Sequence, residues 1–228
     1  LHSFSVSRSH TAGITLNGDV VAWGLSSPSH YPLITNATII YNNGNGAFAV
    51  LDSTGHIHTF GNPISNGPPP DMGYKNIVAS MGAFAAFHED GSIATWGSQH
   101  SGGIDGPSGT GWVTVCAARD AFAALDSNGS IYAWGTNPRY HYNGCGGDYC
   151  GSPGGSTKVV GQPWWFDEPA GDPGTGYVAL FSARQAFTAL HKNGYVYSWG
   201  KKGRGSSQDS GYPSKTDNTF YKIYSNER

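Results

Sequence analysis

Hydrophobic residues in this chain fall in short groups separated by polar turns, and no stretch keeps the 3.6-residue period of a helix beyond a few residues. A typical group reads "AFAAF" at residues 83–87, followed by a turn with Asp and Gly and then by "SIATWG" at 92–97. Small, β-branched and aromatic residues bounded by Asn, Asp and Gly are typical of strands joined by hairpin turns. The pattern therefore predicts an all-β protein.

The same group of strands recurs along the chain, each copy closed by an aromatic residue and a Gly. The first four closing residues are 36 to 38 residues apart and the fifth follows after 65. They are Trp23, Phe60, Trp96, Trp134 and Trp199. One small antiparallel sheet per repeat predicts propeller blades or a β-solenoid. We expect the closing aromatic residues to form the blade core between adjacent sheets, with a hydrogen-bond partner for each indole N–H.

Residues 9–24, "SHTAGITLNGDVVAWG", resemble the repeat of the regulator of chromosome condensation family of β-propellers. The resemblance extends through five units and implies an all-β propeller of residues 1–228, with one small antiparallel sheet per blade. The Asn and the Gly-Gln-Leu-Gly segment that usually follow Trp-Gly in that family are absent, and His10 is the one His that begins a second strand. The chain therefore resembles a divergent member, and the family's guanine nucleotide exchange on a small GTPase is a less favoured function.

Residues 220–228, "FYKIYSNER", align with residues 74–82 and repeat the first strand of a unit, as do residues 1–9. Three explanations are open: a longer protein with more blades, which the family's larger ring favours, a five-bladed or open ring with a surplus strand, or strand exchange between copies. Unpaired strand edges are templates for association, and a head-to-tail contact builds a filament or surface layer. The predicted exchanged strand contains Phe220, Tyr221, Ile223 and Tyr224.

A long insertion rich in Gly and Pro, residues 138–176, separates the fourth and fifth units. Loops of this length are usually functional or mobile. Its aromatic residues are either an interaction hot spot or a cover for propeller edges. They are Tyr140, Tyr142, Trp164, Trp165 and Phe166. Cys145 and Cys150 in "CGGDYC" favour a disulfide that closes a short loop over free thiols, and a metal site is less favoured because a second pair of thiols is lacking. Cys116 lies in an apolar strand and is expected to be a core residue.

Composition narrows the partners and the location. The net charge is −2 with no basic run, which disfavours nucleic acid and anionic lipid as partners, and no apolar stretch approaches the length of a membrane span. Glycosylation sequons begin at Asn36 and Asn128. Together with the predicted disulfide, they favour a secreted, extracellular protein.

Candidate chemistry is sparse. His56 and His58 share one strand face and could chelate an ion, but solvent-facing histidines without a metal are the favoured interpretation because the sequence fixes no carboxylate or Cys beside them. Acids such as Asp52 and Asp126 lie in or beside turns, where turn chemistry places them. No nucleophile elbow, zinc-protease or phosphate-loop motif occurs.

We therefore predict a non-enzymatic, extracellular structural or protein-interaction propeller without cofactor or metal. Its expected partner is another protein or a second copy of the chain. A secreted lectin, with a glycan as ligand, or a secreted inhibitor is the alternative.

Overall fold

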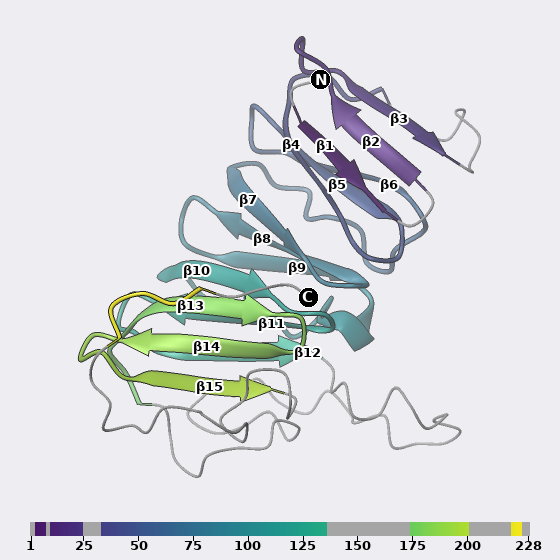
Figure 1. The fold of residues 1–228 in the computed structure, drawn as a ribbon. Coiled ribbons are helices and arrows are strands. Elements are labelled where there is room, and N and C mark those ends of the chain that lie inside the picture. The colour runs from purple at the N-terminus through teal and green to yellow at the C-terminus, as the bar shows by residue number, and fades with distance from the viewer. Residues whose placement is uncertain (1–2, 8–9, 25–32, 136–173, 201–219, 225–228) are drawn as a thin grey trace. The chain divides into compact units, whose positions relative to one another are not determined.

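The structure is a computed structural model that describes residues 3–7, 10–24, 33–135, 174–200 and 220–224 (Figure 1). These residues form five antiparallel sheets of three strands each, one for every predicted unit, which confirms the all-β class. The strands of the first three sheets are β1 (Ser3–Val6), β2 (His10–Ile14), β3 (Val20–Gly24), β4 (Ala37–Asn42), β5 (Ala47–Asp52), β6 (Ile57–Gly61), β7 (Tyr74–Ala79), β8 (Ala83–His88) and β9 (Ile93–Gly97). Those of the last two are β10 (Trp112–Ala117), β11 (Ala121–Asp126), β12 (Ile131–Gly135), β13 (Tyr177–Ala183), β14 (Ala186–His191) and β15 (Val196–Gly200).

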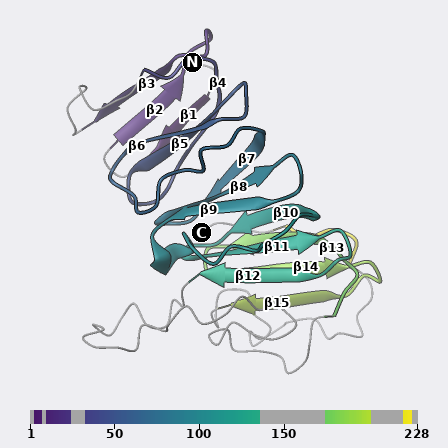
Figure 2. The same ribbon diagram turned by 180° about the vertical axis from the view of Figure 1, so that it is seen from behind.

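The chain divides into two compact units, Leu1–Thr110 and Gly111–Arg228. The first unit holds β1 to β9 and a 3-10 turn, η2 (Gln99–Ser101), and the second holds β10 to β15. Within each sheet the strands follow one another in chain order, with the second strand in the middle, as the reverse view also shows (Figure 2). In the last four sheets the middle strand begins with Ala and Phe, whereas β2 has neither at these positions. A single array spanning residues 1–228 stays a prediction.

Each hairpin between the second and third strands is closed by a Gly in the left-handed region, with φ between 78° and 84°. In the second sheet the N–H of Gly55 donates to the carbonyl of Asp52 at 3.0 Å, and the N–H of Asp52 donates to the carbonyl of His56 at 3.1 Å. The residue before the Gly, which is Thr54 in the second sheet and Asn or Asp in the others, does not adopt a positive φ, so the Gly alone supplies the reversal. This is the three-residue loop with a left-handed Gly, rather than a turn with two positive φ values.

The core repeats one packing unit. In four sheets a Phe of the middle strand stacks on the closing aromatic residue of the third strand, with ring centroids 5.1 to 5.3 Å apart. The pair Phe84–Trp96 packs against Ala47 and Ala49 of the preceding sheet. Small Ala side chains leave room for these rings, which explains why the middle strand alternates Ala with Phe. Contrary to expectation, Trp96 Nε1 is buried without a hydrogen-bond partner among the described residues.

Candidate interaction surfaces

The outer face of the first sheet carries apolar side chains exposed to solvent. Phe4 is 67% exposed, Val6 57% and Trp23 49%, and Val21 is also exposed. The register places Val6 and Trp23 on either side of Thr11, and Phe4 and Val21 on either side of Gly13. Residues directly opposite each other in a sheet point to the same face. The four side chains therefore form one surface, which we call the β1–β3 outer face.

The equivalent face of the next sheet is covered. Phe48 and Phe60 of that sheet pack against Ala12 and Ile14, which lie on the inner face of the first sheet. The first sheet therefore buries its inner face and leaves its outer face open. Contiguous exposed apolar side chains on a folded sheet mark interaction sites more often than scattered ones do.

The first sheet also lacks the aromatic pair of the other four. Thr11 stands opposite Trp23, where the other sheets place a Phe. Trp23, which the sequence pattern places in the blade core, is consequently half exposed, whereas the other four closing residues are buried. Its exposure has two physical causes: no ring stacks on it within the sheet, and no sheet covers it from outside among the described residues.

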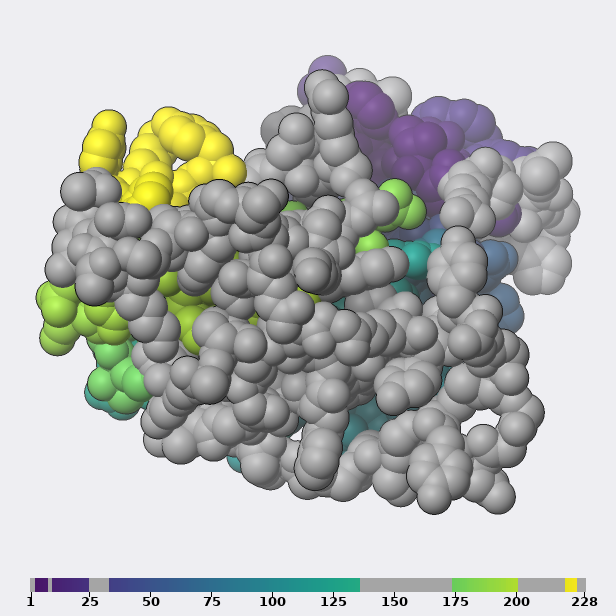
Figure 3. Space-filling view, turned by 60° about the horizontal axis from the view of Figure 1, so that its bottom comes forward, coloured from purple at the N-terminus to yellow at the C-terminus, as the bar shows by residue number. Residues whose placement is uncertain are grey.

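A second surface is formed by residues 220–224. The N–H of Phe220 donates to the carbonyl of Gly194 at 3.0 Å. In the same way, the N–H of Tyr74 donates to the carbonyl of Gly55 at 3.0 Å at the start of β7, the first strand of the third sheet. Phe220 thus occupies the starting position of a further first strand. The four residues after it form no strand, and Tyr221 and Tyr224 project from the surface, where Figure 3 shows this segment in yellow. Ile223 is half-buried.

Several predicted residues lie outside the described parts of the chain: Cys145, Cys150, Tyr140, Tyr142, Trp164, Trp165 and Phe166. The structure places the two sequon residues, Asn36 and Asn128, with exposed side chains. Cys116 lies on β10, packed against the core of the second unit, and burial raises the pKa of its thiol to about 12, although a hydrogen bond with Ser182 opposes the shift. The Cys116 thiol is therefore neutral and unreactive at physiological pH.

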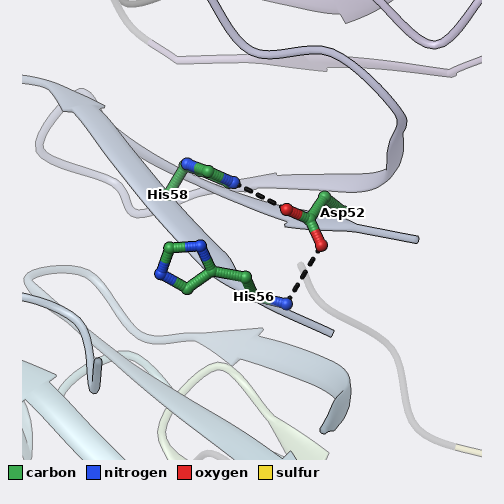
Figure 4. Close-up of side chains that lie close together, drawn as sticks. All are labelled: Asp52, His56 and His58. Atoms are coloured by element: carbon green, nitrogen blue, oxygen red, sulfur yellow. Dashed lines mark hydrogen bonds and ion pairs between the residues drawn. The ribbon is translucent and has the colours of Figure 1, made fainter. Parts of the chain in front are cut away.

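A histidine–carboxylate cluster lies at the β5–β6 hairpin (Figure 4). The ligand atoms of Asp52, His56 and His58 all lie within 4.8 Å of one another. His58 Nε2 is 2.8 Å from Asp52 Oδ2, and the centroids of the two imidazole rings are 4.6 Å apart. Sequence reasoning paired the two histidines but missed Asp52. The register that pairs Val50 with His58 puts residues 52, 56 and 58 on one face, and the spacing of the two histidines alone does not show this register.

The carboxylate of this cluster is ionised. Partial burial acts to raise the pKa of Asp52, but hydrogen bonds from the Thr54 hydroxyl, the His58 ring and the backbone N–H groups of His56 and Thr54 outweigh it and hold that pKa well below its usual value. All three residues of the cluster are half-buried. They are the residues in the described parts of the chain that could hold a metal ion.

Comparison with known proteins establishes the fold. No protein-family model and no curated protein match the chain. Among solved structures, Prp20p from Saccharomyces cerevisiae, reported with its binding properties to Gsp1p and histones, aligns with a TM-score of 0.52 and 13% identity over 87% of this chain and 57% of its own. The CRINKLY WD40 ectodomain of the Arabidopsis thaliana receptor kinase ACR4 aligns with a TM-score of 0.50 and 12% identity over 86% of this chain and 62% of its own.

The fold is that of a β-propeller resembling the regulator of chromosome condensation. At these identities the similarity carries the fold and not the function. The chain spans about 60% of the length of these structures. Within the described ranges, no helix is long and apolar enough to cross a membrane.

Proposed function

We propose that this chain is a non-enzymatic, extracellular protein-interaction propeller whose β1–β3 outer face binds a sheet of a protein partner. One observation carries the proposal: Phe4, Val6 and Trp23 are exposed, while the equivalent ring pair of the next sheet, Phe48 and Phe60, is buried against Ala12. A face that is covered in the neighbouring sheet and open here supports a docking role for the β1–β3 outer face. The partner it fits presents small side chains, as Ala12 does to Phe48.

The energetics favour this surface. Full burial of a Val or Phe side chain contributes about 1.5–3 kcal/mol, and binding energy concentrates in aromatic anchors near the centre of an interface. Trp23 and Phe4 supply two such anchors on a rigid sheet. This gain must exceed the loss of translational and rotational freedom on association and the cost of ordering the exposed side chains.

A second copy of the chain is the partner we favour. Phe220 has the same backbone hydrogen bond that begins a first strand in the earlier repeats, and residues 221–224, the described residues after it, form no strand. An unpaired segment with strand-forming residues adds readily to a sheet of another chain. If one end of each copy binds the other end of the next, association continues into a filament or layer. The exposed sequon residues Asn36 and Asn128 support an extracellular location.

Sedimentation velocity over a wide range of protein concentration tests the proposal. We expect concentration-dependent association of the intact chain, and monomers for the double variant Phe4→Ser/Trp23→Ser. Leu33→Ser, another exposed apolar position of the first unit that lies outside this face, is the matched control and should associate like the intact chain. Removal of residues 220–228 separately tests strand exchange.

A monomer at every concentration would contradict association between copies. In that case crosslinking and mass spectrometry of native material would identify a different protein partner, which Phe4→Ser/Trp23→Ser should no longer bind. Mass spectrometry of the peptides with Asn36 and Asn128 tests the location, since glycans there require passage through the secretory pathway.

A further inference from the structure

We propose that Asp52, His56 and His58 bind a divalent transition-metal ion of the Zn²⁺ class at the β5–β6 hairpin. Two imidazole nitrogens and one carboxylate are a donor set that suits Zn²⁺ and its neighbours Ni²⁺ and Cu²⁺, rather than Ca²⁺ or Mg²⁺, which prefer oxygen ligands. The three ligand atoms lie within 4.8 Å of one another. The inference stands apart from the proposed protein-binding function.

The geometry is close to that of a bound ion. With Zn–N and Zn–O distances of about 2.0–2.2 Å and tetrahedral angles, two ligand atoms are about 3.3–3.6 Å apart. His58 Nε2 and Asp52 Oδ2 are 2.8 Å apart, so an ion must open this hydrogen bond by about 0.5–0.8 Å. The ligand nitrogen of His56 lies within 4.8 Å of the other two ligand atoms. Rotation about the side-chain torsions of His56 can bring this nitrogen to the bound ion.

The turn holds the carboxylate in place. Asp52 Oδ1 accepts hydrogen bonds from the N–H of Thr54 at 2.9 Å, the Thr54 hydroxyl at 2.6 Å and the N–H of His56 at 3.1 Å. These bonds occupy one carboxylate oxygen and direct the other, Oδ2, toward His58 (Figure 4). Hydrogen bonds that orient a ligand before the ion arrives raise metal affinity, commonly by 10- to 100-fold.

The donor set is not a requirement of the hairpin. The β11–β12 hairpin has the same turn, in which Asp126 Oδ1 accepts hydrogen bonds from the N–H of Asn128 at 2.9 Å and of Ser130 at 2.7 Å. In that hairpin, Ser130 and Tyr132 stand where the β5–β6 hairpin has His56 and His58. Turn formation therefore explains the aspartate but not the two histidines. Three protein ligands leave one tetrahedral position for water, and the half-exposed site admits it.

Zn²⁺ titration of the tag-free chain tests the inference, followed by calorimetry and by ¹⁵N NMR of the imidazole nitrogens. We expect the first equivalent of Zn²⁺ to shift the signals of His56 and His58 before those of the other histidines. Asp52→Asn should weaken binding at least tenfold, because the amide keeps the Oδ1 acceptor of the turn but loses the anionic ligand. His58→Ala, which leaves the turn bonds of Asp52 Oδ1 in place, should weaken it similarly.

Two controls separate the site from general effects. Asp126→Asn makes the same change in a hairpin without the histidines, and His100→Ala removes an exposed histidine of η2; both should bind like the unchanged chain. The titration is repeated with Cys145→Ser/Cys150→Ser, because thiolates compete for Zn²⁺. Circular dichroism of each variant verifies folding.

Three results would overturn the inference. The first is equal Zn²⁺ affinity of Asp52→Asn and Asp126→Asn. The second is a first equivalent that leaves the His56 and His58 signals in place, and the third is no binding at any Zn²⁺ concentration tested. In each case the hydrogen bonds of Asp52 stabilise the hairpin, and the three residues do not form a metal site.

Discussion

The first and third sheets end in the same two letters, Trp and Gly, but the two tryptophans have opposite surroundings. Trp23 is half exposed, while Trp96 is 1% exposed. Trp96 stacks on Phe84 within its own sheet and packs on Ala47 and Ala49 of the sheet before it. Trp23 faces Thr11 and has no such cover among the described residues. The motif thus sets the position of the ring in the sheet, and the neighbouring sheet decides whether the ring is core or surface.

The largest expected effect separates the two tryptophans directly. Trp96→Ala should lower the free energy of unfolding by about 3–5 kcal/mol, because it removes a stacked ring and leaves a cavity. Trp23→Ala should lower it by less than about 1 kcal/mol, since a half-exposed ring gives up less contact. Urea unfolding followed by circular dichroism measures both. Equal losses would mean that a sheet or partner covers Trp23 in solution.

The Gly after Trp96 gives the next effect. Gly97 has a φ of 109°, and a Cβ built on it would lie 2.7 Å from both Ala83 Cα and the carbonyl oxygen of Gly82. Gly97→Ala should therefore destabilise the protein by about 1–3 kcal/mol, through backbone strain and contact with backbone atoms. Gly67→Ala is the matched control, since no atom lies within 4 Å of its added Cβ. Similar unfolding midpoints for the two variants would contradict the claim that the strand end requires Gly at position 97.

A buried serine of the third sheet provides a smaller contrast. Ser80 Oγ donates to the carbonyl of Ser101 at 2.7 Å and accepts from the N–H of Ala83 at 3.1 Å. In the first sheet, Ser7 Oγ accepts from the N–H of His10 at 3.1 Å but is only partly buried. Ser80→Ala should cost about 1–2 kcal/mol and Ser7→Ala about 0.5 kcal/mol, because the first leaves buried groups unpaired. Amide hydrogen exchange at Ala83 and His10, alongside urea unfolding, distinguishes local from global loss.

The strands and the hairpins were predictable from the sequence, because they depend on residues that lie close together in the chain. The exposure of Trp23 was not, because it depends on which sheet lies next to the first one. The link between Asp52 and His58 was missed for a similar reason. It needs the hairpin register as well as the turn bonds that leave one carboxylate oxygen free, and the spacing of the two histidines shows neither.

The smallest effect concerns the indole nitrogen of Trp96. A buried N–H without a partner costs free energy that a well-paired group would not. The second sheet uses Phe60 at the equivalent position, stacked on Phe48 with ring centroids 5.1 Å apart, so a phenyl ring satisfies the same packing. Trp96→Phe loses ring volume but removes the unpaired N–H, and the two terms should nearly cancel, within about 1 kcal/mol. Urea unfolding of Trp96→Phe beside Trp96→Ala measures this. A loss as large as that of Trp96→Ala would show that the indole N–H has a partner in solution and that the full indole, rather than stacking alone, holds the third sheet on the second.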